Sequence, residues 1–408
     1  MEQVIVEVTS TVTVAIALFG AVFSLAQTKY SRVSKSFAAF LAAITANNFA
    51  DGFAELVEVL PSAVSRPAEL ILGLPSSLML APLFWIYVYT LTSPTQRYPS
   101  RLYLHLFLPI LAMLVGLIIA IFAPEVWETL YEDAPLPTSA LPFSLLLTVI
   151  FLQLALYPPI GIYLFLIIQR LMRHRLRLRD VYASTEKHEL RWIYVIGGLS
   201  FLFWIVLTSI LFFAFGTEQS EAPTEVVVLS SLVGLALVST TTFWGLRQRP
   251  PLVPDIEFTE TNEPIEEAKR SLSEQVSEKY EKSALSPEAS KRITGKLRAA
   301  MEKDHLHRDA NLSLWTLARH IGASPNYISQ TLNEEIGESF FDFVNGYRIA
   351  EAKVLLTTTN DTVLSITYDV GFNARSSFYN SFKRVTGQTP TNYRKSLSRR
   401  DGMDDEQA

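Results

Sequence analysis

The sequence predicts an all-α protein in two parts: a bundle of seven transmembrane helices, followed by a helical domain with two helix-turn-helix motifs. Long apolar runs fill the chain up to about residue 247, and charged side chains return beyond it. Lys and Arg gather in alternate loops between those runs. From residue 286 onward, one helix-turn-helix pattern occurs twice. These three observations indicate a membrane-embedded half and a water-soluble half.

A transmembrane helix needs roughly 20 mostly apolar residues. Candidate stretches lie at about 6–27, 37–60, 69–93, 103–123, 142–169, 192–216 and 225–246. The second stretch is the most polar, since it contains Asn48, Asp51, Glu55 and Glu58. Whether it crosses the membrane is therefore decided by the charges of the loops.

Cytoplasmic loops of membrane proteins carry an excess of Lys and Arg. The first, third and fifth loops and the segment after the last stretch together hold fourteen Lys and Arg residues, seven of them in 170–191. The second, fourth and sixth loops hold only Arg66. This asymmetry requires all seven stretches to cross, with the N-terminus outside and the C-terminus in the cytoplasm. We expect a multi-pass protein of a bacterial inner membrane, whose C-terminal half shares a compartment with DNA.

Several kinds of site are not expected. The chain has no cysteine, which excludes disulfides, thiolate metal sites and cysteine nucleophiles. It contains no Walker loop, dinucleotide fingerprint or nucleophile elbow, so neither a cofactor nor an enzymatic activity is predicted. His305 and His307 lie two residues apart without a third ligand nearby, and we expect surface residues there rather than a metal site. Glu2 and Glu7 stand where a cleavable signal needs basic residues.

The predicted domains are residues 1–247 in the membrane, a linker at 248–285, a second domain at 286–397 and an acidic, disordered tail at 398–408. Within the linker, 250–262 contains three prolines, whereas 263–283 has apolar side chains at helical spacing. That second segment is either a solvated connector or a short dimerising helix. The latter would make the protein a homodimer.

The repeat in the second domain pairs residues 317–337 with residues 366–387. Each copy has an apolar helix, a turn with glycine, an N-cap residue, a second helix and a glycine that ends it. The expected N-caps are Ser324 and Asn373. This order is that of a helix-turn-helix. Two bundled helices give a similar pattern, but its repetition favours the motif.

Residues 338–358 lie between the copies and predict one long helix. Its expected buried residues are Phe340, Phe343, Val344, Tyr347, Ala350, Val354 and Leu355. About 19 residues at 1.5 Å each give roughly 28 Å, close to the major-groove repeat of about 34 Å. The helix is therefore a spacer suited to placing two recognition helices in successive grooves.

These residues resemble the DNA-binding domain of the AraC/XylS transcription regulators. The matching elements are "LA..IG.SP.Y.S" at 317–329, "SF.DFVN.YRI..AK.LL" at 339–356, "VGF" at 370–372 and "F...FKR.TG.TP..YR" at 378–394. The front half with "KYEKSAL" at 279–285 looks like the membrane-bound branch of that family. The resemblance implies a domain of seven helices that binds promoter DNA, usually activates transcription and contacts RNA polymerase.

Helical periodicity separates a core face from an outward face on each recognition helix. The expected core residues are Ile328, Leu332, Ile336, Phe378, Phe382 and Val385. The outward candidates for base contact are Asn326, Gln330, Asn333, Arg375, Ser376, Asn380 and Lys383. Amides suit adenine edges, and Arg and Lys suit guanine. The candidates for phosphate contact are Ser324, Asn373, Arg384, Arg394 and Lys395. A solvated helix face is the alternative for each.

The first recognition helix ends on the acidic pair Glu334 and Glu335. Carboxylates beside phosphates are unfavourable. We therefore expect the first motif to read sequence less strongly than the second.

The polar residues Asn48, Asp51 and Glu55 share one face of the second stretch. Asp51 lies roughly 21 Å from the cytoplasmic start near residue 37. Ionisable groups at such depths usually mark function, so these three residues are candidates for sensing a small or lipophilic ligand. Alternatively, Glu55 reaches the outer interface and a neighbouring helix satisfies Asp51.

Together these features predict a membrane-integral, one-component transcription regulator. Its expected partners are promoter DNA, the lipid bilayer, RNA polymerase and an unidentified ligand. Two alternatives stay open: a transporter or channel with a regulatory DNA-binding tail, and a bundle that only anchors the regulator.

Overall fold

The computed structural model describes residues 2–28, 30–53, 56, 59, 69–95, 97–131, 134–186, 188–216, 224–248, 252 and 286–396. The chain forms two compact units. The bundle unit contains Met1–Met172 and Leu190–Val253, and the helix-turn-helix unit contains Arg173–Glu189 and Pro254–Ala408. Within the described ranges the regular elements are helices, together with one isolated antiparallel bridge between Tyr182 and Ser313. The all-α prediction is therefore confirmed for those residues.

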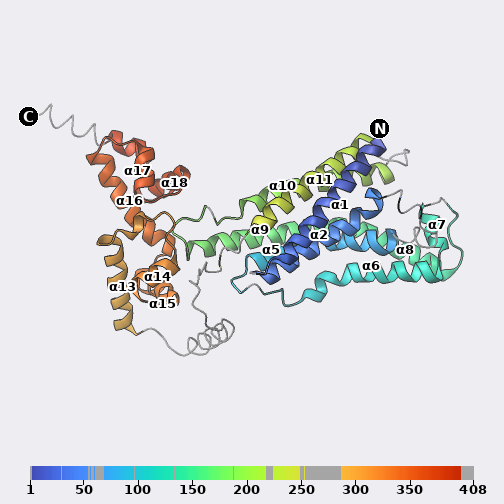
Figure 1. Ribbon diagram of the computed structural model, residues 1–408, viewed down its shortest axis with the longest axis horizontal. Coiled ribbons are helices and arrows are strands. Elements are labelled where there is room, and N and C mark those ends of the chain that lie inside the picture. Colours follow the sequence, from blue (N-terminus) through green and yellow to red (C-terminus); the bar gives the residue numbers. More distant parts are fainter. Residues whose placement is uncertain are drawn as a thin grey trace, which may run out of the picture. The chain divides into compact units, whose positions relative to one another are not determined.

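The bundle unit consists of long helices that follow the apolar stretches (Figure 1). They are α1 Glu2–Ala26, α2 Ser31–Gly52, α5 Leu74–Leu91, α6 Leu102–Phe122, α8 Ala140–Leu154, α9 Tyr157–Arg179, α10 Arg191–Gly216 and α11 Thr224–Arg247. A short helix, α7 Glu125–Tyr131, lies in the loop between α6 and α8, and a π-helical turn η1 at Glu69–Gly73 precedes α5. The boundary between the units falls inside α9, whose last residues belong to the helix-turn-helix unit.

Helix α1 packs against both α2 and α11, and α2 packs against α5. Small residues permit the close crossing of α1 and α2: a Cβ on Gly52 would lie 2.9 Å from the backbone nitrogen of Thr11. The Thr11 hydroxyl donates a 2.6 Å hydrogen bond to the Gly52 carbonyl at the same place. The outer surface of the bundle is apolar, with side chains such as Phe107 and Phe165 more than 60% exposed. This is the surface expected of helices that contact lipid.

By length and composition, six described segments suit a membrane crossing. They are Val4–Ala26, Leu70–Leu91, Leu102–Phe122, Ala140–Arg179, Arg191–Ser209 and Thr224–Arg247. The predicted stretch at 37–60 is not among them. Its first part forms α2, but Asn47, Asn48 and Asp51 lower its hydropathy, and Glu55 and Glu58 lie outside the described residues. The count of seven is therefore not confirmed.

The helix-turn-helix unit holds the elements of the second predicted domain. They are α13 Pro287–Glu302, a 3₁₀ turn η2 Leu306–Arg308, α14 Leu314–Ile321, α15 Pro325–Thr331, a π-helical turn η3 Leu332–Ile336, α16 Phe340–Thr358, α17 Val363–Asp369 and α18 Arg375–Thr386. The connector at 263–283 and the tail at 398–408 lie outside the described residues.

Two hydrophobic cores fill this unit, and α16 contributes to both. Its first turns supply Phe340, Phe343 and Val344 to a core with α13, α14 and α15. Its later turns supply Ile349, Ala352 and Leu356 to a core with α17 and α18. The predicted spacer helix of 19 residues is therefore confirmed.

The buried face of α16 differs from the predicted one. Ala350 is exposed and Val354 is 57% exposed, while Ile349, Ala352 and Leu356 are buried instead. The two cores lie against different faces of the helix, so one uniform stripe does not describe it. Val385, predicted in the core of the second copy, is 53% exposed, because the core of that copy is completed by Phe372, Phe378 and Phe382.

Candidate functional site

In the first helix-turn-helix copy, local signals in the sequence fix the ends of α14. The Ser313 side chain accepts a 3.2 Å hydrogen bond from the Thr316 backbone N–H and so caps the start of the helix. Gly322, with φ of 62°, ends it in the left-handed region. The recognition helix then begins at Pro325 after Ser324, which is the N-cap residue as predicted.

In the second copy, Thr362 caps α17 and the turn passes through Gly371. A Cβ on Gly371 would lie 2.6 Å from the His307 carbonyl oxygen, so the turn packs directly on the chain before the first copy. Asn373 was predicted as the N-cap of α18, but Ala374 occupies that position. The Asn373 amide instead donates a 2.7 Å hydrogen bond to the Ala310 carbonyl. Its side chain thus joins the second turn to the segment before α14.

The base-contact candidates lie on outward faces, as the periodicity predicted. Ile328, Leu332, Phe378 and Phe382 are buried beneath them. Six candidates are exposed and Gln330 is half-buried, the exposed ones being Asn326, Asn333, Arg375, Ser376, Asn380 and Lys383. The helix-turn-helix unit therefore presents two polar faces, one on each recognition helix.

Arg375 is held in place by an aromatic residue one turn further along α18. Its guanidinium lies 4.9 Å from the centre of the Tyr379 ring and donates a 3.2 Å hydrogen bond to the Tyr379 hydroxyl. Such a contact restrains a long side chain before it meets a partner. The i, i+4 spacing of the two residues was visible in the sequence, but the role of Tyr379 was not predicted.

Gln330 has a different neighbour. Its side-chain amide donates a 2.9 Å hydrogen bond to the Glu334 carboxylate. One of the two N–H donors of this amide is thus occupied within the first copy itself. Glu334 and Glu335 are both exposed beside it.

The phosphate candidates fall into two groups. Lys395 is exposed, whereas Arg394 is half-buried and donates a 3.1 Å hydrogen bond from Nε to the Leu356 carbonyl at the end of α16. Arg384 is about half exposed and lies 2.6 Å from the Asp342 carboxylate. Two of the predicted basic contacts therefore also hold the fold together.

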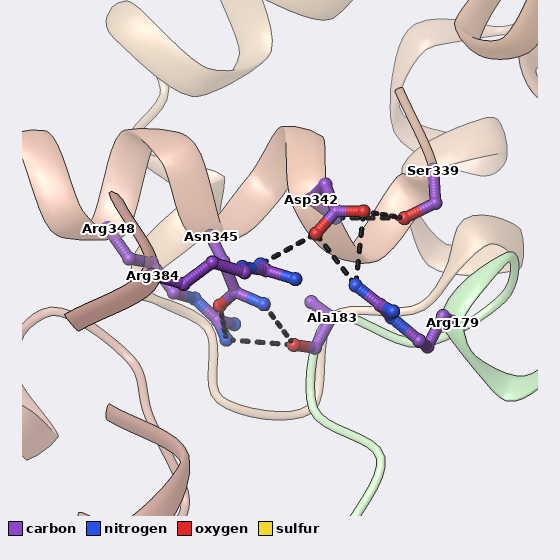
Figure 2. A network of polar contacts seen from close by, with 7 residues as sticks. All are labelled: Arg179, Ala183, Ser339, Asp342, Asn345, Arg348 and Arg384. Carbon is purple, nitrogen blue, oxygen red and sulfur yellow. Dashed lines mark hydrogen bonds and ion pairs between the residues drawn. The ribbon is translucent and has the colours of Figure 1, made fainter. Parts of the chain in front are cut away.

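Asp342 is the centre of a polar network that joins three parts of the unit (Figure 2). It accepts hydrogen bonds from Ser339 at 2.7 Å and from Arg179 at 2.9 Å, besides the ion pair with Arg384. Both guanidinium groups also lie against the ring of the preceding residue, Phe341. Partial burial raises the pKa of Asp342, but the Ser339 hydrogen bond and the two arginines outweigh it and hold the pKa below its usual value.

Arg348 lies at the point where the two cores meet and is fully buried. Its guanidinium donates to the carbonyls of His307 at 2.6 Å, Asp309 at 2.8 Å and Ala183 at 3.3 Å. It also donates to Ser184 Oγ at 3.0 Å and to Asn345 Oδ1 at 3.2 Å. Burial lowers the pKa of Arg348 to about 10, so it stays charged at neutral pH. Its spacing of four from Val344 and from Ala352 was the signal in the sequence for this position.

His307 was predicted at the surface but is 5% exposed. Its Nδ1 lies 3.0 Å from the Met301 carbonyl and its Nε2 lies 2.6 Å from the Glu351 carboxylate, which also pairs with Arg308. Burial raises the pKa of Glu351, but its hydrogen bonds from Arg308 and His307 outweigh this and lower it. The turn after α13 is thereby tied to α16.

The bundle unit contains a cavity of about 830 Å³. Its walls are mostly apolar, but Thr9, Thr13, Asn47, Asn48 and Asp51 contribute polar groups to it from α1 and α2. The structure thus brings two of the three sensing candidates to one cavity, whereas Glu55 lies outside the described residues. The volume is within the usual range of small-molecule sites, about 300–1,000 Å³.

Residues 317–396 match the family described as "Helix-turn-helix domain". An uncharacterized HTH-type transcriptional regulator of Staphylococcus aureus (strain COL) is 40% identical over 90 residues, which are 22% of this chain and 12% of the relative. The arabinose operon regulatory protein of Escherichia coli (strain K12) is 33% identical over 91 residues, 22% of this chain and 31% of that protein. The C-terminal part of the chain is a helix-turn-helix domain of the AraC type.

The matched stretch spans less than a third of either relative, and it does not include the bundle unit. Two solved structures are also similar. The C-terminal domain of AraT, a response regulator from Geobacillus stearothermophilus, is 26% identical with a TM-score of 0.24, covering 28% of this chain and 88% of that one. The C-terminal domain of the two-component response regulator yesN from Fusobacterium nucleatum is 27% identical with a TM-score of 0.23, covering 26% and 98%.

Proposed function

We propose that this protein is a membrane-integral, one-component transcription regulator whose bundle unit senses a ligand and whose helix-turn-helix unit binds promoter DNA. The observation that carries the proposal is the presence in one chain of an AraC-type domain and of six helices suited to crossing a membrane. Signal reception and output then need no separate sensor kinase. Membrane location rests on the apolar exterior of the bundle and on the distribution of Lys and Arg among its loops.

DNA reading is assigned to the outward faces of α15 and α18. Arg375, Lys383 and Asn380 on α18 suit guanine and adenine edges, and Asn326 and Asn333 offer amides on the first helix. Arg384, Lys395 and the helix N-termini near Ser324 and Asn373 contact phosphate. Arg394 contributes less, because part of its guanidinium is bound to the end of α16. In this proposal the protein activates transcription through RNA polymerase.

Ligand sensing is assigned to the cavity of the bundle unit. Its apolar walls suit a lipophilic body, and Asp51 with Asn48 offers a negative and a hydrogen-bonding end to a cationic or hydroxylated head group. A ligand that binds two arrangements of the helices with different affinity shifts the population between them. All seven predicted spans and the outside N-terminus belong to this proposal.

The proposal is tested by genome-wide mapping of DNA bound to the full chain in its native host, beside a variant lacking residues 286–408. Discrete promoter sites that vanish in the variant are expected. If no DNA site is recovered with the full chain more strongly than with the deletion variant, the assignment of DNA binding is overturned.

Sensing is tested with Asp51→Asn, which keeps shape and removes charge. It is expected to change the response of the mapped promoters to the inducing stimulus at normal protein level. The matched control is Glu125→Gln, an exposed carboxylate on α7 that does not line the cavity. Equal responses of wild type and Asp51→Asn contradict the assignment of the sensing site.

Replacing the bundle by an unrelated multi-span anchor, while keeping residues 173–189 of the helix-turn-helix unit, separates sensing from tethering. If regulation by the stimulus survives the exchange, the bundle is only an anchor. Stoichiometric uptake of a solute by the purified protein in vesicles is the result that favours a transporter with a regulatory tail.

A further inference from the structure

The segment from Arg179 to Thr185 docks on the helix-turn-helix unit, although about 100 residues of sequence separate it from α13. We call these residues the docking strand. Its backbone pairs with the start of the first helix-turn-helix copy. The Ala183 N–H donates to the Leu312 carbonyl at 3.2 Å, and the Leu314 N–H donates to the Val181 carbonyl at 2.8 Å. Tyr182 and Ser313 face each other across this short antiparallel bridge.

Side chains of the docking strand complete the first hydrophobic core. Ala183 is 1% exposed and belongs to the same cluster as Leu312, Leu317 and Ile328. The Tyr182 ring meets the edge of Trp315 at 5.7 Å between ring centres. Removing the strand would therefore expose apolar surface of the helices that carry the first recognition helix.

The docking strand also anchors the spacer helix. The Ala183 carbonyl accepts hydrogen bonds from Asn345 at 3.1 Å and from Arg348 at 3.3 Å (Figure 2). Ser184 Oγ accepts a further one from Arg348 at 3.0 Å. Arg348 is the residue that binds the segment before α14 to α16, where the two cores meet. The strand thus helps to fix the position of one helix-turn-helix copy relative to the other.

At the end of α9, Arg179 shares its partners with a residue of the second recognition helix. Arg179 and Arg384 bind the same Asp342 carboxylate (Figure 2). Both guanidinium groups also lie against the Phe341 ring. On their own, the Asp342 carboxylate and the Arg384 guanidinium form a pair with no net charge. When Arg179 is present, these three side chains carry one net positive charge, and Arg179 and Arg384 compete for the same carboxylate. A seated strand therefore favours contact between α18 and DNA phosphate.

The same helix lines the cavity of the bundle unit. Helix α9 is continuous from Tyr157 to Arg179, and Tyr163, Ile167 and Leu171 from its earlier turns face the cavity. Residues of the cavity wall and Arg179 of the docking strand therefore belong to one helix.

We propose that the docking strand is an intramolecular regulatory contact: when seated it holds the two helix-turn-helix copies in the arrangement that binds DNA, and its release weakens binding. This inference rests on the proposed function and adds the route by which the bundle acts on DNA affinity. When the two linked copies are already fixed in one arrangement, the unit loses less conformational freedom on binding DNA, and this strengthens binding.

The full chain has no cysteine, so no native thiol competes with an engineered pair of cysteines. The variant Tyr182→Cys with Ser313→Cys places thiols on the two bridge residues, and a protease site inserted between residues 253 and 285 lets a denaturing gel show whether the disulfide formed. DNA affinity is measured on the protein in membrane vesicles, oxidised and then reduced, with a promoter fragment recovered by the mapping. Each single-cysteine variant is the control.

The oxidised pair is expected to bind DNA threefold or more tightly than the reduced pair, with no such difference in the single variants. If the disulfide does not form while both single thiols react with a maleimide, the docking is wrong. If it forms and affinity stays the same or falls, the regulatory role is wrong. If neither form of the pair nor the wild type binds any DNA, the proposed function itself fails.

A second variant tests the charge contribution without a covalent lock. Arg179→Ala is expected to weaken DNA binding about threefold to tenfold, and Arg179→Lys to restore part of the loss. Arg175→Ala removes the same charge from the same basic run, where Arg175 pairs with Glu189 rather than with α16, and is expected to leave affinity unchanged. Equal losses from the Ala variants at 175 and 179 overturn the role given to Arg179.

Discussion

The two helix-turn-helix copies have the same order of helices but differ in what surrounds their recognition helices. In the first copy, the helix ends in a π-helical turn with exposed Glu334 and Glu335, and its core includes Ala183 from the docking strand. In the second copy, α18 ends with Lys383 and Arg384, and its core consists of residues that follow in the same stretch of sequence. A side chain from a distant segment of the sequence completes the hydrophobic core of the first copy but contributes none to the core of the second.

This difference indicates a division of roles. The second copy has the restrained arginine, Arg375, and the basic helix end that suit strong DNA contact. The first copy has an amide already bound to a carboxylate and a core that depends on the docking strand. We therefore expect the second copy to supply most of the reading of sequence, and the first to supply sensitivity to the bundle.

The largest expected effect comes from removing the docking strand. A soluble fragment of 286–408 keeps both copies and is expected to bind DNA, but more weakly than a fragment with residues 173–186 fused before Ser286 through a flexible linker. Losing the five hydrogen bonds to Val181, Ala183 and Ser184 costs on the order of 5 kcal/mol, at about 1 kcal/mol each. Amide hydrogen exchange is expected to rise in α13 to α15 and to change less in α17 and α18. Equal loss of protection in both copies contradicts the claim that only the first copy depends on the docking strand.

The second expected effect separates the two recognition helices directly. Arg375→Ala is expected to cost about 1–3 kcal/mol at one base pair and to relax preference there. Gln330→Ala is expected to cost less, because its amide is already bound to Glu334. Lys395→Ala, which removes a proposed phosphate contact, is expected to weaken binding to all sequences alike. Binding selections on randomised duplexes give these numbers, and a larger loss of preference from Gln330→Ala than from Arg375→Ala reverses the assignment.

A gain of affinity is expected from neutralising the acidic end of the first recognition helix. Glu334→Gln with Glu335→Gln removes two carboxylates near phosphate and is expected to tighten binding to every duplex a few-fold, with a steeper dependence on salt. The control is Glu288→Gln, an exposed carboxylate at the start of α13. Salt titrations of DNA affinity make the comparison, and an unchanged slope means that this helix end does not approach the duplex.

The smallest expected effect is on stability in acid. The folded-state pKa values of Asp342 and Glu351 lie below their usual values of 3.8 and 4.5. Their contribution is therefore complete above those usual values and is lost as pH falls through the lower folded values. Hydrogen exchange in α16, corrected for intrinsic rates, is expected to accelerate below about pH 4. Glu351→Gln is expected to make the exchange rate less dependent on pH. If protection of α16 in the wild type persists unchanged at pH 3, the predicted loss of stability in acid is wrong.

Local patterns in the sequence predicted the parts of the fold that depend on neighbours in the chain. The glycines that end α14 and α18, the spacer α16 and the burial of Phe378 and Phe382 all follow from spacing along one helix. Val385 and Ala350 were misplaced because the apolar stripe was taken to continue straight across two separate cores. The spacing of Arg348 from Val344 and Ala352 indicates a buried position, but periodicity could not predict that an arginine fills it, because its acceptors come from elsewhere in the chain.

The docking strand had no signal of its own in the sequence. It starts at the last residue of a basic run that follows a predicted span, so the charges of Arg175, Arg177 and Arg179 were assigned to membrane topology. The pairing with Leu312 and Leu314 depends on a contact across more than 120 residues, which periodicity cannot detect.

Because the docking strand comes early in the chain, the order of synthesis matters for assembly. About 130 residues separate Ala183 from Leu312, with which it pairs, so at 5–20 residues per second the strand waits roughly 7–26 s for this partner to be synthesised. The bundle is therefore made before the DNA-binding unit can be completed. A gene fusion that exchanges the first 247 residues for a foreign membrane domain keeps the whole first recognition helix. It removes, however, the docking strand that completes the hydrophobic core beneath that helix.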